Sequence, residues 1–187
     1  PATAPLFRRI VRGRDILPWR CAPTRYLIAL PAGWTAQTFG EEISAVQAWA
    51  QMAERFPQIQ QHLALRRGAG LRPWWELPQR DLHAFDQPQL VWPAASIRPR
   101  FALTSPGQVV GPGACHAPGS PFLLGILMSR LAWIALSSYY PLGKTHRLWP
   151  AQVARLPLPE ASESDQAAVS QLAQRIAGIS EDCAELE

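Results

Sequence analysis

Apolar and polar positions along this chain form short blocks separated by prolines and glycines. Residues 6–12 alternate and stop at Gly13, which predicts a strand. Residues 26–30 are apolar between two prolines and predict a buried strand. Residues 90–92 predict another strand, followed by a Pro-Ala-Ala-Ser turn and a return strand over residues 97–103. Glycines at 107, 111 and 113 punctuate further short strands.

Helices are predicted where apolar residues recur at helical spacing behind a capping signal. Thr38 and Glu41 have the spacing of a capping box that opens one helix, and Pro57 begins a second that runs to residue 67. A short helix is expected over residues 81–85. Ser120 precedes a helix over residues 122–138 that is apolar nearly all round, as expected of a core element.

The last part of the chain predicts two more helices. Trp149 and Pro150 begin a short one that reaches residue 155. Ser162 and Asp165 then cap an amphipathic helix, whose apolar stripe consists of Val169, Leu172, Ala173 and Ile176.

These elements together predict an α+β fold, with a mixed, partly antiparallel sheet packed on a central apolar helix and a C-terminal amphipathic helix. We expect a domain over residues 1–160 and a helical tail over residues 161–187, because prolines break the pattern near residue 158. No run of about 18 uncharged apolar residues predicts a membrane span. The N-terminus lacks the order of a signal peptide and has no initiator methionine. We therefore expect a cytoplasmic location and a longer parent chain.

Charge is distributed unevenly over the 187 residues. The residues before Leu156 carry 17 basic and 7 acidic side chains, a net charge of +10, whereas the rest carry 1 basic and 7 acidic side chains, a net charge of −6. A basic body of this kind is compatible with a polyanionic partner.

Catalytic and metal-binding patterns are weak. Nucleotide-binding glycine loops and a Gly-x-Ser-x-Gly elbow are missing from the sequence, and its carboxylates are too scattered for an acid/base pair. The metal-like pairings, which are Asp81 with His83, His62, and Cys115 with His116, have no second pair at ligand spacing. The three cysteines are widely spaced and are expected to be thiols. We predict neither an active site nor a cofactor within this chain.

The predicted hairpin after residue 87 carries a pair of arginines. Pro99 favours extended geometry at Arg98, so alternation would place Arg98 and Arg100 on the same side of a strand. Two guanidinium groups displayed together suit phosphate or guanine recognition.

Five segments, in order, resemble the TaqI-like C-terminal specificity domain of adenine-specific DNA methyltransferases and type IIG restriction–modification enzymes. The first is the Arg-Gly-Arg-Asp-Ile run at residues 12–16, and the second covers the helix at 56–67 with the Trp-Trp segment at 74–77. The third is the hairpin at 88–101, and the fourth is the helix at 123–129, where Met128 replaces the usual Asn. The fifth ends in the Leu-Pro-Leu-Pro run at 156–159.

The resemblance implies a recognition domain for double-stranded DNA in a phage-defence system. A methyltransferase catalytic domain, in cis or in trans, would hold S-adenosylmethionine and methylate adenine N6 after base flipping. Nothing in this chain matches that catalytic part, whose Pro-Pro motif is missing. The residues expected to contact DNA are basic and lie in four segments: Arg98, Arg100, Lys144, His146, Arg147, Arg12, Arg14, Arg66 and Arg67.

Structural roles compete with this interpretation. Arg12 and Arg14 could pair with Asp15 or cap a strand end, and Arg98 and Arg100 could brace the hairpin. Arg66 and Arg67 lie at a predicted helix C-terminus, where the helix dipole favours cations. Trp74 and Trp75 could stack on a base, although tryptophans in apolar company are usually core residues.

Two rival functions remain. The chain could be a protein-interaction module that docks on a methyltransferase partner through its C-terminal helix, as the helical spacers of type I specificity subunits suggest. The salt dependence of DNA binding separates this alternative from DNA recognition. An autonomous nuclease is the other rival, and the scattered carboxylates predict no cleavage of plasmid DNA with magnesium.

Overall fold

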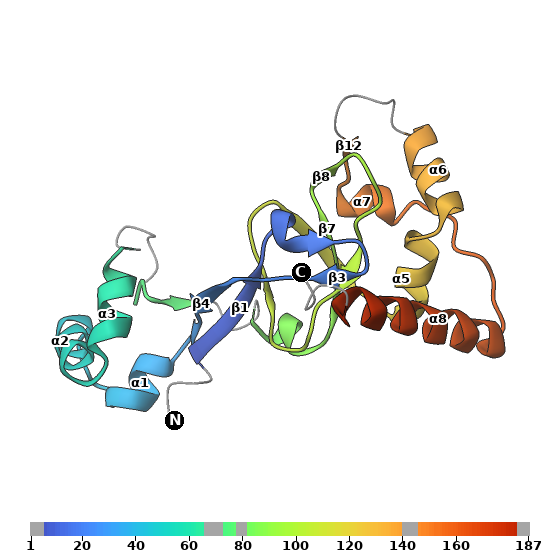
Figure 1. Ribbon diagram of the computed structural model, residues 1–187. Coiled ribbons are helices and arrows are strands. Elements are labelled where there is room, and N and C mark those ends of the chain that lie inside the picture. The colour runs from blue at the N-terminus through green and yellow to red at the C-terminus, as the bar shows by residue number, and fades with distance from the viewer. Residues whose placement is uncertain (1–5, 66–72, 78–81, 140–145, 183–187) are drawn as a thin grey trace. The chain divides into compact units, whose positions relative to one another are not determined.

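The computed structural model describes residues 6–65, 73–77, 82–139 and 146–182 (Figure 1). The fold is α+β, as expected. The chain divides into two compact units, one of residues 1–8 and 26–86 and the other of residues 9–25 and 87–187. This division differs from the expected boundary at residue 160, because residues 1–160 contribute to both units and residues 161–187 belong to the second.

The first unit is mainly helical. Its elements are β5 (Leu30–Pro31), α1 (Trp34–Phe39), α2 (Ala45–Arg55), α3 (Pro57–Ala64), β6 (Glu76–Leu77) and the 3₁₀ turn η3 (Ala84–Asp86). β5 and β6 pair in parallel. Strand β4 (Arg25–Ile28) leads into this unit. The buried strand expected over residues 26–30 is therefore interrupted at Ala29, and Tyr26 is 60% exposed rather than buried.

The helix start expected at Thr38 and Glu41 is wrong. Thr38 lies inside α1, and the capping box is formed by Ser44 and Gln47 at the start of α2. The Gln47 amide donates to Ser44 Oγ at 3.3 Å, and the Ser44 amide donates to Gln47 Oε1 at 3.2 Å. Pro57 begins α3 as predicted.

Tryptophans form the centre of the first unit's core. Trp75 is 2% exposed, and its Nε1 donates to Thr35 Oγ1 at 2.8 Å. Its ring centroid lies 5.4 Å from that of Trp74 and 5.3 Å from that of Trp49. The core interpretation of Trp75 is therefore correct, since this indole is not available to stack on a base.

The second unit is built around strand β7 (Gln89–Pro93). β7 lies between two antiparallel neighbours, β11 (Ala114–Pro118) and β9 (Ala102–Leu103). Both faces of β7 are covered, because Leu90 and Trp92 belong to one buried cluster and Val91 to another. Trp92 Nε1 also donates to the carbonyl oxygen of Leu148 at 2.7 Å.

Short strand pairs surround this sheet. They are the end of β1 (Phe7–Val11) with β10 (Val109–Val110), β2 (Ile16–Leu17) with β3 (Arg20–Cys21), and β8 (Ala95–Ser96) with β12 (His146–Arg147). The 3₁₀ turn η2 (Gly13–Asp15) connects β1 to β2. The predicted strand before Gly13 is therefore confirmed.

The predicted return strand is correct in its pairing and wrong in its extent. Leu103 pairs with Leu90, but residues 97–101 are not a strand. Ser96 Oγ donates to the carbonyl oxygen of Arg98 at 2.7 Å and so fixes a bend there. Alternation along one strand therefore does not place Arg98 and Arg100 on the same side.

Four helices complete the second unit: α5 (Pro121–Leu127), α6 (Arg130–Tyr139), α7 (Pro150–Val153) and α8 (Glu163–Asp182). The single helix expected over residues 122–138 is wrong, because α5 and α6 meet at a 62° bend. Ser129 Oγ accepts a hydrogen bond from the Ala132 amide at 3.2 Å and starts a new helix. Leu136 is buried, but Leu131 is 80% exposed, so only part of the apolar surface belongs to the core.

Among the described residues, no single helix is long and apolar enough to cross a membrane. The bent α5–α6 pair together has the required length and apolar composition.

The C-terminal helix α8 packs along α5 (Figure 1). Gly125 of α5 allows this approach, because a Cβ there would stand 2.8 Å from Val169 Cγ1. Ala173 is 1% exposed at this contact, whereas Leu172 is 55% exposed and Ile176 is 41% exposed. The predicted apolar stripe is therefore divided between a packed edge and an exposed edge.

Candidate functional site

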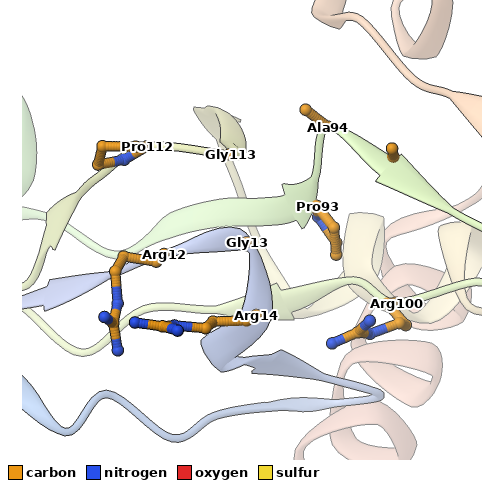
Figure 2. A pocket seen from close by; sticks show the side chains of 9 residues that line it. Arg12, Gly13, Arg14, Pro93, Ala94, Arg100, Pro112 and Gly113 are labelled. Atoms are coloured by element: carbon orange, nitrogen blue, oxygen red, sulfur yellow. The ribbon is translucent and has the colours of Figure 1, made fainter.

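An open pocket of about 600 Å³ lies in the second unit (Figure 2). Its lining contains three arginines, Arg12, Arg14 and Arg100. The other lining residues are small or cyclic and come from three turns: Gly13, Pro93, Ala94, Ala95, Pro112 and Gly113. Arg12 and Arg14 belong to one segment of the chain and Arg100 to another, so the fold brings basic residues together that lie far apart in the sequence.

Three turns meet at the pocket through their backbones. The Gly13 amide donates to the Pro112 carbonyl oxygen at 3.3 Å, and the Ala94 amide donates to the Gly113 carbonyl oxygen at 2.9 Å. A Cβ at Gly13 would overlap the Gly113 carbonyl, so glycine is required for this approach. The pocket's inner wall is therefore fixed backbone.

Arg12 is engaged by Asp15. Its Nε and Nη2 donate to the two carboxylate oxygens at 2.8 and 2.9 Å, and its amide donates to Oδ2 at 2.9 Å. These hydrogen bonds hold the pKa of Asp15 below its usual range, although burial acts in the opposite direction. The same hydrogen bonds raise the pKa of Arg12. Of the two roles considered for Arg12, the structure shows the pairing with Asp15.

Arg100 is engaged by the backbone. Its Nε donates to the carbonyl oxygen of Ile16 at 2.9 Å, and its Nη2 donates to the same oxygen. The bracing role considered for Arg100 is therefore observed, although the brace fixes the end of the 12–16 turn rather than the hairpin itself. Asp15 and Ile16 are adjacent, so two arginines hold neighbouring points of one turn.

Arg14 directly precedes these two braced residues on the same turn, and it is exposed. Among the described residues, no hydrogen bond or ion pair holds its guanidinium. Its charge acts on Asp15 only at longer range, where it contributes to the lowered pKa of that carboxyl. Arg14 is therefore the exposed arginine of the pocket, whereas Arg12 Nη1 is buried without a hydrogen-bond partner in the described part of the chain.

The strand pair of β8 and β12 adds basic residues beside the pocket. Arg147 pairs with Ala95, and directly opposed residues of an antiparallel pair share a face, so Arg147 lies on the face that Ala95 turns to the pocket. Arg147 and Arg98 are both exposed. The backbone of His146 pairs with Ser96.

The remaining predicted contacts, Arg66, Arg67 and Lys144, lie outside the described residues, as does Asp81. His83 Nδ1 lies 3.2 Å from Asp86 Oδ2. Neither Cys21 nor Cys115 forms a disulfide with another described residue. Burial raises the pKa of Cys115. Within the described part of the chain, no three His, Cys, Asp or Glu side chains form a group that could hold a metal ion.

Sequence reasoning missed the walls of the pocket. The Gly-Pro-Gly run at residues 111–113 indicates only a turn, and the Pro-Ala-Ala run at residues 93–95 only a hairpin connection. Nothing local shows that both turns meet Gly13. The Arg-Gly-Arg-Asp pattern was the available signal, because it flanks a glycine with two guanidinium groups.

A search against protein-family models finds no match for this chain, and a search of curated proteins finds no similar sequence.

Proposed function

We propose that this chain is a recognition domain for double-stranded DNA in a restriction–modification system. It would hold the duplex and read the target sequence. A methyltransferase catalytic domain, in cis or in trans, would bind S-adenosylmethionine and methylate adenine N6. The five ordered segments that resemble the TaqI-like specificity domain support this proposal.

One observation carries the proposal: the fold of the second unit gathers arginines from distant segments at one open pocket. Arg14 is exposed there, and Arg98 and Arg147 are exposed on the segments that follow and pair with its wall. Duplex DNA carries a negative charge for about every 1.7 Å of its axis, so a row of guanidinium groups is the expected complement.

The division of labour follows from how each arginine is held. Arg12 and Arg100 donate hydrogen bonds to Asp15 and Ile16, so they would order the surface on which the duplex lies. The exposed arginines would supply contacts to phosphate oxygens and base edges. This chain would therefore contribute affinity and sequence selection, and the catalytic domain would contribute the chemistry.

The test is selection from a randomised duplex library, followed by binding isotherms at several salt concentrations. A common sequence should be enriched, and affinity should fall steeply between about 50 and about 200 mM salt. The combined replacement of Arg14, Arg98 and Arg147 by alanine should weaken binding and flatten the salt dependence. Arg155→Ala is the matched control, because Arg155 is an exposed arginine of the same unit that does not line the pocket. Unenriched sequences would contradict the proposal, as would equal effects of both variants.

A second candidate function is supported by the exposed edge of α8. Leu172, Ile176 and Ile179 are 55%, 41% and 61% exposed and recur at helical spacing. This edge fits a methyltransferase subunit whose docking surface is apolar and basic, because the chain from residue 156 onward has a net charge of −6. Replacing Leu172 and Ile176 with serine should abolish co-purification with that subunit and leave DNA affinity unchanged. If the chain is instead a dimer in solution and the same change converts it to a monomer, the exposed edge of α8 contacts a second copy of this chain.

A further inference from the structure

The pocket holds one exposed cation, Arg14, and the turn that carries it is held by hydrogen bonds from the other two arginines. Arg14 is exposed on the η2 turn, directly before Asp15 and Ile16, the two residues held by the bracing arginines. The carboxylate of Asp15 offsets the charge of Arg12, so the pocket keeps the charges of Arg14 and Arg100. The site is therefore electropositive and rigid at its base.

The lining also restricts the chemistry of a ligand. Apart from the arginines, the side chains are those of glycine, alanine and proline, which offer no acceptor to a ligand's donors. A phosphodiester presents only acceptors, as does a guanine edge, whereas adenine and cytosine edges present donors that this lining would leave unpaired. The small side chains also allow a bulky group to approach the backbone wall closely.

We propose that this pocket binds a single phosphodiester group of the DNA backbone, with Arg14 as the contacting residue. Asp15 and Arg100 are positioning residues, since they act on the ligand only through the turn that carries Arg14. The inference rests on the proposed DNA-recognition function and assigns this pocket to duplex positioning rather than base reading. Sequence selection then falls to residues outside it.

Replacing Asp15 tests the positioning role, because that role and long-range electrostatics predict opposite changes in DNA affinity. Asp15→Asn removes a negative charge beside the pocket, so long-range electrostatics alone would strengthen DNA binding. The positioning role requires the opposite, because the neutral amide cannot hold both Arg12 nitrogens as the carboxylate does, and the turn loses its brace. Asp86→Asn is the matched control, since Asp86 pairs with Arg8 in the first unit.

The first measurement titrates inorganic phosphate into the ¹⁵N-labelled chain, whose mass of 20.7 kDa suits amide spectra. The amides of residues 13–15 should shift in the wild type, shift less in Asp15→Asn and stay unchanged in Arg14→Ala. Dispersed amide signals of Arg14→Ala that match those of the wild type away from the η2 turn would establish that the variant is folded.

The second measurement is DNA affinity against salt. Each phosphate contact contributes about 0.9 to the salt slope, so the wild type should lose about 3.5-fold more affinity than Arg14→Ala between about 50 and about 200 mM salt. The loss in Arg14→Ala should be the same for all duplex sequences, and Arg14→Lys should retain most of the slope, because lysine also serves a phosphate.

The outcomes separate the two proposals. If Arg14→Ala relaxes the preference for one base pair and Arg14→Lys does not rescue it, Arg14 reads a base and the phosphate assignment is overturned. DNA binding that survives Arg14→Ala with an unchanged slope also overturns it, while leaving the proposed function standing. Phosphate-dependent shifts without any DNA affinity would support the phosphate site and refute DNA recognition. Stronger DNA binding by Asp15→Asn would refute the positioning role.

Discussion

The close approach of the Gly13 and Gly113 turns offers a test of how the second unit is held together. In Gly13→Ala the new Cβ would overlap the Gly113 carbonyl oxygen and stand 2.7 Å from its carbonyl carbon. Both groups belong to the backbone, so no flexible side chain can move aside. The two turns must therefore separate.

The cost follows from the contacts that this separation disturbs. Overpacking of a fixed contact costs about 1–3 kcal/mol. Separation also weakens the hydrogen bonds from the Gly13 amide to Pro112 and from the Ala94 amide to Gly113, and each such bond contributes about 0.5–1.5 kcal/mol. We therefore expect Gly13→Ala to destabilise the protein by about 2–5 kcal/mol. For a chain of this size the midpoint of thermal unfolding should fall by roughly 10 °C.

The same substitution elsewhere provides the controls. At Gly178 in α8 a Cβ would meet nothing within 4 Å, so Gly178→Ala should stabilise the helix by about 0.5–1 kcal/mol. Gly125→Ala should lie between the two, because the gain in helix propensity opposes a contact with Val169 Cγ1 at 2.8 Å. Thermal and urea unfolding monitored by circular dichroism would rank the three variants. A Gly13→Ala protein as stable as Gly178→Ala would refute the reasoning.

Three further predictions concern buried polar groups. Trp92→Phe should cost about 1–3 kcal/mol in urea unfolding, because the Leu148 carbonyl oxygen loses its indole donor; an unchanged midpoint would contradict this. Glu76→Ala should cost about 0.5–2 kcal/mol and speed amide exchange in α1, because the amides of Gly33 and Thr35 donate to that carboxylate at 2.8 and 2.6 Å; unchanged exchange in α1 would argue against it. The pKa of Asp15 is lower in the folded protein than in the unfolded chain, so the unfolded chain takes up this proton first as the pH falls. The contribution of the Asp15 carboxylate to the free energy of unfolding is therefore present above the unfolded pKa of about 3.9 and is lost as the pH falls through the lower folded pKa. On acidification below about pH 4, the free energy of unfolding of Asp15→Asn should therefore fall less than that of the wild type. An equal fall in both proteins, measured by urea unfolding at several pH values, would refute this.

Local signals in the sequence determined many of the elements. Proline at the first helical position marked α3, and Ser120 with Pro121 marked α5, because these residues act through backbone groups only a few positions away. The apolar run at residues 90–92 correctly indicated the central strand. Competing local signals caused the errors: Thr38 has capping-box spacing to Glu41, but Ser44 and Gln47 form the box.

The candidate site could be predicted only in part for a similar reason. Residues 12–16 already contained Arg12, Arg14 and a carboxylate at hydrogen-bonding distance along the chain, so the choice between pairing and exposure was open at the sequence level. The structure resolves it for Arg12, which pairs with Asp15. The corresponding role of Arg100 depends on Ile16, which lies 84 positions away, and no periodicity encodes such a partner.

The sequence by itself therefore determined many of the strands and helices and the excess of positive charge before residue 156, because both depend on neighbouring residues and composition. Only the tertiary structure decided which arginines are occupied. The meeting of the Gly13, Ala94 and Gly113 turns creates the pocket, and the braces from Arg12 and Arg100 leave Arg14 exposed within it. The physical reason is that a guanidinium donates to whichever acceptor the fold places within about 3 Å. For Arg12 that acceptor is three positions away along the chain, whereas for Arg100 it is 84 positions away and is fixed by long-range packing.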